Sequence, residues 1–155
     1  MKLIVYTIGR LGKAYWREAE KEYLNRLRHY TRLEIKELKD VRARGRSVEE
    51  MKHAESQTVL KEIADEAFLV VLDRSGSEMT SVQLAEFIES KQIHRTATLA
   101  FAVGGPYGFS DPLFSRADMI LSLSRMTLPH ELARIVLLEQ LYRAFTILKG
   151  EKYHK

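Results

Sequence analysis

The chain has 155 residues, with 45% hydrophobic and 30% charged side chains and no cysteine. These figures predict one globular domain, and the missing cysteine excludes disulfides, Cys-ligated metal sites and a thiolate nucleophile. The chain carries 25 Lys and Arg against 21 Asp and Glu, a formal net charge of +4. This mild basic excess permits an anionic partner without requiring one.

The basic excess lies mostly in the first third of the chain. Residues 1–53 carry 14 Lys and Arg against 8 Asp and Glu, a balance of +6. Two runs supply it: Arg26, Arg28 and Arg32, then Lys39, Arg42, Arg44 and Arg46. Clustered arginines suit phosphate oxygens, but a solvated helix end and loop explain the same pattern.

No segment has the pattern of a targeting or membrane-spanning element. The apolar run Leu3–Ile8 is shorter than the apolar region of a signal peptide. The longest uncharged stretch, Thr96–Ser110, is too short for a bilayer span and contains Gly and Pro. We therefore expect a cytoplasmic protein without a membrane partner.

Short apolar runs alternate with segments of helical periodicity along the whole chain. In the first half of the chain we expect a strand over Leu3–Ile8, a helix over 13–30, a strand over 33–38 and a helix over 47–65. A strand should then run from Phe68 and end at Asp73, before a turn through Ser75 and Gly76. In the second half we expect a helix from Thr80 or Ser81, a strand over Thr96–Val103, a short helix after Ser110, a strand over Met119–Leu123 and a helix over Pro129–Lys149. This order predicts a single-domain α/β sandwich with a mainly parallel sheet.

Capping residues mark several of the predicted helix starts. Ser47 with Glu50 three residues later has the pattern of a capping box. Thr80 or Ser81, Ser110 and Thr127 are candidate caps for the later helices.

The last predicted helix has a wider apolar arc than contact with one core requires. Its apolar side chains cover more than half a turn: Leu137, Leu138, Leu141, Tyr142, Ala144, Phe145 and Leu148. The excess predicts a homodimer; the alternative is a helix that lies centrally in its own fold.

Three of the predicted strands end in segments rich in small or polar residues. These are 72–76, Gly104–Gly108 and 123–130, and ligands of open α/β sheets gather beyond such carboxyl ends. The glycines at 104–108 do not have the spacing of a dinucleotide-binding motif or of a P-loop. Two explanations for them remain: the backbone approaches a ligand closely, or the segment is a simple tight turn.

A metal site is not expected. His130 and Glu131 begin a pattern like the zinc motif HExxH, but Arg134 stands where the second histidine ligand would be. The terminus is unusual because it carries Tyr153 and His154, which suit base stacking and proton transfer.

Together these segments resemble the SPOUT methyltransferases, and among them the ribosomal RNA large subunit methyltransferase H family. The resemblance rests on Gly-Gly-Pro-x-Gly at 104–108, Ser-x-Ser-x-Met-Thr-Leu-Pro-His at 122–130, Arg134, the run 139–144 and the terminal Tyr153-His154. It covers nearly the whole chain and is most specific in the second half.

The resemblance implies a C-terminal trefoil knot, S-adenosylmethionine bound in the knot loops, and a homodimer that methylates N3 of a pseudouridine in 23S ribosomal RNA. The implied cofactor-binding residues are Leu72, Gly104, Leu123, Ser124, Arg125, Met126, Thr127 and Leu128, with no individual role for Arg125 or Met126. Those implied around the acceptor are His130, Arg134, Tyr142, Arg143, Tyr153 and His154.

The absence of cysteine favours nitrogen over carbon as the methyl acceptor, because carbon methylation of pyrimidines commonly needs a cysteine adduct. We expect Arg134 or Arg143 to stabilise the imide anion and His154, or else His130, to accept the proton. The tail could come from the partner subunit, and the modest charge favours the assembled ribosome over free RNA as substrate.

The alternative function is a non-catalytic, ribosome-associated RNA-binding protein. A flavodoxin-like phosphate-binding enzyme fits poorly, since 9–12 is too sparse in Gly, Ser and Thr.

Overall fold

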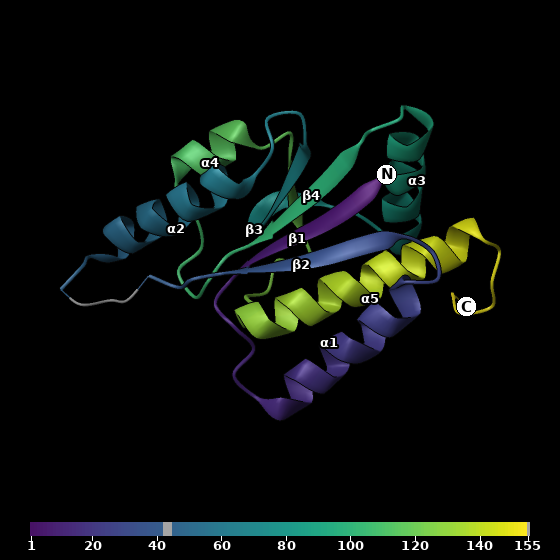
Figure 1. The fold of residues 1–155 in the computed structure, drawn as a ribbon, viewed down its shortest axis with the longest axis horizontal. Helices are drawn as coiled ribbons and strands as arrows, with labels where there is room; N and C mark the ends of the chain where they lie inside the picture. The colour runs from purple at the N-terminus through teal and green to yellow at the C-terminus, as the bar shows by residue number, and fades with distance from the viewer. Residues whose placement is uncertain (42–44, 155) are drawn as a thin grey trace.

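Five parallel strands form the centre of the protein. The computed structural model describes residues 1–41 and 45–154, so Arg42 and Arg44 of the second basic run lie outside the described residues. The strands are β1 (Lys2–Ile8), β2 (Arg32–Leu38), β3 (Phe68–Glu78), β4 (Thr98–Val103) and β5 (Met119–Ser122), and they form one sheet in the order β2-β1-β4-β3-β5. The predicted α/β fold with a mainly parallel sheet is confirmed (Figure 1).

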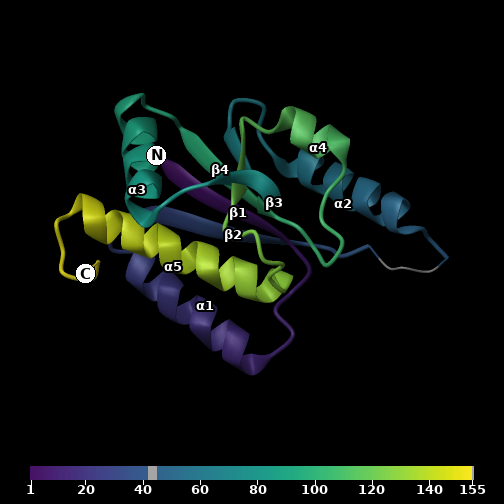
Figure 2. The ribbon, with the colours of Figure 1, turned by 180° about the vertical axis from the view of Figure 1, so that it is seen from behind.

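Helices cover both faces of the sheet (Figure 2). The helices are α1 (Ala14–Leu27), α2 (Val48–Glu62), α3 (Ser81–Ile93), α4 (Asp111–Arg116) and α5 (His130–Leu148). Helices α1, α3 and α5 cover one face of the sheet and form the first hydrophobic core with it, while α2 and α4 cover the other face and form the second core. Side chains of β1 alternate between the two: Leu3 and Val5 belong to the first core, and Ile4 and Tyr6 belong to the second. Burial of both faces explains why the inner strands β1 and β4 are apolar along almost their whole length.

Three of the predicted caps occupy the N-cap position of their helix, and Thr127 does not. Ser47 and Thr80 each form a complete capping box. At Ser110 the side chain makes no capping hydrogen bond; its backbone N–H donates to Ser56 Oγ at 2.9 Å. Helix α5 begins after Pro129, which has no side-chain acceptor, so Thr127 lies outside the cap position.

Strand β3 is longer than predicted. Leu72 and Ser77 both pair with Leu121 of β5, so the four residues between them leave the ladder and the strand then resumes to Glu78. Within this excursion the Ser75 backbone N–H donates to Asp73 Oδ1 at 2.8 Å. A Cβ on Gly76 would lie 2.6 Å from the carbonyl carbon and oxygen of Ile120. The expected end of the strand at Asp73 is therefore wrong, because backbone contact with β5 restores the pairing.

The wide apolar arc of α5 is largely covered within one chain. The helix lies on the sheet between α1 and α3, and the fully buried Leu137, Leu138, Leu141 and Ala144 belong to the first core (Figure 1). A central position in the fold, the alternative to a dimer contact, accounts for this arc.

A buried arginine holds the first half of α5 in place. The Arg134 side chain is only 3% exposed and forms ion pairs with Glu20 of α1 and, at 3.0 Å, with Glu37 of β2. Its guanidinium also donates to Thr7 Oγ1 of β1 at 3.2 Å. Burial raises the pKa of Glu20, and Arg134 opposes that rise. One guanidinium thus joins α5 to three other elements.

Replacing Arg134 by Met should lower the free energy of unfolding by about 3–5 kcal/mol, because it leaves the Glu20 carboxylate buried without its partner. Urea denaturation followed by circular dichroism measures the change. The control is Arg10→Met, which removes an 89% exposed partner of Glu37 and should cost less than about 1 kcal/mol. Equal losses in the two variants would contradict the role assigned to Arg134.

Candidate functional site

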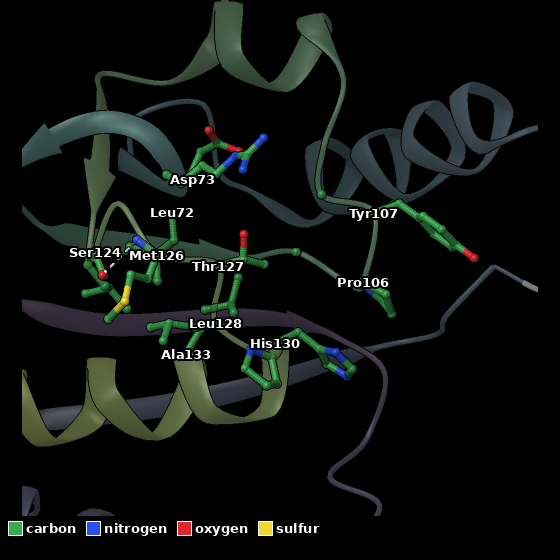
Figure 3. A pocket seen from close by; sticks show the side chains of 17 residues that line it. Leu72, Asp73, Pro106, Tyr107, Ser124, Met126, Thr127, Leu128, His130 and Ala133 are labelled. Carbon is green, nitrogen blue, oxygen red and sulfur yellow. Dashed lines mark hydrogen bonds between the residues drawn. The ribbon is translucent and has the colours of Figure 1, made fainter.

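A cavity of about 660 Å³ opens at the carboxyl end of the sheet, where the three predicted strand ends meet (Figure 3). It is lined by three loop segments and the start of α5: Leu72, Asp73, Arg74, Val103, Gly104, Gly105, Pro106, Tyr107, Gly108, Leu123, Ser124, Met126, Thr127, Leu128, Pro129, His130 and Ala133. Because all five strands are parallel, segments far apart in sequence come together at one edge. Its volume is in the range of sites for small molecules and cofactors.

The cavity wall is mainly aliphatic side chains and loop backbone. Leu72, Leu128 and Ala133 supply apolar surface, and Thr127 and His130 add polar groups (Figure 3). This mixture suits an amphipathic ligand, whose flat part packs on aliphatic walls while its polar part meets backbone and hydroxyl groups.

The segment after β5 is ordered by its own serines. Ser122 Oγ donates to the Ser124 carbonyl at 3.0 Å, and the Met126 backbone N–H donates to Ser124 Oγ at 3.0 Å. Arg125 does not line the cavity; its side chain is 87% exposed and pairs with Glu78 at 3.2 Å. Seven of the eight residues implied for the cofactor therefore line the cavity, and Arg125 does not.

The glycine segment after β4 forms a tight turn. The Gly108 backbone N–H donates to the Gly105 carbonyl at 3.1 Å, which places Pro106 and Tyr107 at the exposed tip. A Cβ on Gly104 would lie 3.2 Å from Gly108 Cα and 3.3 Å from Phe109 Cε2. Glycine at 104 therefore lets the two ends of the turn approach each other in the cavity wall.

The residues implied around the acceptor divide into two groups. His130 lines the cavity, and Arg134 lies behind it, buried in its ion pairs. Arg143, Tyr153 and His154 do not line this cavity.

The second group lies along the far half of α5. The Tyr153 hydroxyl donates to Glu139 Oε1 at 3.2 Å, and its ring packs against Tyr142 at 4.7 Å between centroids. The Arg143 guanidinium lies 4.7 Å from the centroid of Tyr153 and pairs with Glu139 at 2.6 Å. Desolvation and the neighbouring Glu139 raise the pKa of Tyr153 above its usual value.

One rigid helix separates the two groups. Glu139 follows His130 by nine residues, which corresponds to about 13 Å along a helix. The tail turns back beside the C-terminal end of α5 (Figure 1), and Tyr153 contacts Glu139 of that helix. A single chain therefore does not bring His154 to the cavity.

Several residues of the site did not follow from the sequence individually. Two of the three segments identified from the sequence contain cavity residues that were given no individual role: Asp73 and Arg74 in the first, and Gly105 in the second. Ala133 follows His130 by three residues on the same helix face. Glu55 was missed entirely, although its spacing with Met51 and Val59 places it on the buried stripe of α2.

Within the described residues, no helix is long and apolar enough to cross a membrane, and no three His, Asp or Glu side chains gather as metal ligands would.

Known proteins resemble this chain over its full length. A family model described as "Predicted SPOUT methyltransferase" matches residues 1–154. A protein of Geotalea daltonii is 42% identical over 154 residues and one of Cytophaga hutchinsonii is 40% identical over 154 residues, each covering 99% of both chains. A protein of Halothermothrix orenii is 39% identical over 159 residues and 100% of both chains. All three carry the name ribosomal RNA large subunit methyltransferase H. This chain belongs to the SPOUT methyltransferase family.

Proposed function

We propose that the protein transfers a methyl group from S-adenosylmethionine to N3 of a pseudouridine in 23S ribosomal RNA, in the cytoplasm and on the assembled ribosome. The observation that carries this proposal is the cavity, because the three loops that resemblance to the family implies for the cofactor form its wall. The names of the relatives support the RNA substrate.

The residues at the cavity fit the methyl donor. Leu72, Leu123 and Leu128 offer apolar surface for an adenine ring, while Ser124 and Thr127 offer hydroxyl groups for the ribose and amino acid portions. When bound, S-adenosylmethionine supplies an electrophilic methyl group. These loops orient the ligand and exclude water around it.

The acceptor chemistry needs the removal of one proton. N3 of pseudouridine loses its proton to His154 or, less directly, to His130, and the nitrogen lone pair then faces the methyl group. Arg143 stabilises the negative charge of the imide, and Tyr153 packs against the base. Arg134, buried in its ion pairs, acts by fixing the start of α5 and with it His130.

A homodimer supplies the acceptor residues to the cavity. Because α5 separates His154 from the cavity of its own chain, the tail that completes each site comes from the partner subunit. Isologous pairing of two chains gives two equivalent composite sites.

The C-terminal segment also supports a trefoil knot. Strand β5 is an edge strand, whereas α5 lies over the middle of the sheet, and residues 123–129 connect them. That connection lines one cavity together with the loops after β3 and β4, which is the place where the chain would thread.

Isothermal titration calorimetry tests the cofactor assignment. The wild-type protein should bind S-adenosylmethionine, and Gly104→Val should weaken binding by about tenfold or more, because its side chain crowds the turn that forms the wall. Ala97→Val, at an exposed position just before the same strand, should bind as the wild type does. A wild-type protein without affinity for S-adenosylmethionine would favour the non-catalytic RNA-binding alternative.

His154→Ala should lower kcat for methylation of ribosomes by about a hundredfold or more, because it removes the proton acceptor. Tritium transfer to purified ribosomes lacking the modification measures the rate, and mass spectrometry of the nucleosides identifies the product. The matched control is His53→Ala, an exposed histidine on α2. Unchanged turnover in His154→Ala would eliminate this base assignment.

A further inference from the structure

Helix α2 presents two buried polar side chains to the glycine segment that walls the cavity. Glu55 is 3% exposed and Ser56 is 0% exposed, on a helix whose outer face is charged. Neither residue lines the cavity. Buried polar side chains cost folding free energy unless they are hydrogen-bonded, so their placement under a binding loop calls for a physical reason.

Ser56 holds the far end of the loop. Its Oγ accepts a hydrogen bond from the Ser110 backbone N–H at 2.9 Å and donates one to the Lys52 carbonyl at 2.8 Å. The hydroxyl is thus fixed by its own helix and in turn fixes the residue that precedes α4.

Glu55 holds the near end, at Gly105. A Cβ on Gly105 would lie 3.0 Å from Glu55 Oε2 and 3.2 Å from Oε1, so the carboxylate packs directly against the backbone of the buried glycine. Burial raises the pKa of Glu55, and the adjacent Gly105 backbone opposes that rise. Oε2 has no hydrogen-bond partner in the described part of the chain.

We propose that Glu55 is a positioning residue for the methyl-donor cavity: with Ser56 it fixes both ends of the segment 105–110, so that the wall is in its binding geometry before the ligand arrives. This inference rests on the proposed function. Under this proposal α2 supports the cavity wall from behind, although none of its residues lines the cavity. Order present before binding reduces the entropy that the ligand must overcome.

Calorimetric titration of the full chain with S-adenosylmethionine tests the proposal in Glu55→Ala and Glu55→Gln, with Glu49→Ala as the matched control on the exposed side of α2. Glu55→Ala should raise the Kd about tenfold, because it removes the side chain that packs against the Gly105 backbone. Glu55→Gln keeps a side chain of the same size against Gly105 and should retain part of the affinity. Glu49→Ala should leave the Kd unchanged.

Amide hydrogen exchange provides a second measurement without ligand. In Glu55→Ala, peptides covering 104–110 should exchange faster than in the wild type, while peptides of α5 should not change. A Glu55→Ala protein with wild-type Kd and wild-type exchange would overturn the inference, as would a lower melting temperature with an unchanged Kd. Failure of the wild type itself to bind S-adenosylmethionine would instead overturn the proposed function.

Discussion

The rigidity and anchoring of α5 determine how this protein can work. The 19-residue helix is fixed at its first half by the buried Arg134, which joins it to α1, β1 and β2. His130 is therefore held at the cavity, while the tail packs beside Glu139 about 13 Å further along. The proposed site uses residues at both ends of this helix, and this is why the proposal includes a second copy of the chain.

The cavity depends on a different constraint, the close approach of backbone segments at the carboxyl edge of a parallel sheet. Gly76 lies against the backbone of β5, and Gly105 lies against the Glu55 carboxylate. Side chains at either position would separate layers that the structure brings into contact. The glycine turn in the wall is therefore largely backbone, and Glu55 and Ser56 of α2 lie against this turn and the residue that follows it.

Much of this architecture could be predicted from the sequence because it is encoded locally. Apolar runs and helical spacing predicted the order of the elements, and Ser47 and Thr80 marked helix starts through contacts three residues away. Features set by distant contacts could not be predicted in this way. Strand β3 resumes because it pairs with β5, and α5 is central because α1 and α3 pack on either side of it. The buried positions of Arg134 and Glu55 likewise depend on contacts with residues far away in sequence.

Heterodimers test the composite site most directly. Two differently tagged chains, one with Gly104→Val in the cavity wall and one with His154→Ala in the tail, are coexpressed, and the heterodimer is isolated by successive affinity steps. Each homodimer should be inactive. The heterodimer should methylate ribosomes at about half the wild-type rate, because one of its two sites combines an intact cavity with an intact tail. An inactive heterodimer would contradict the account, since it would place the cavity and tail of one site on the same chain.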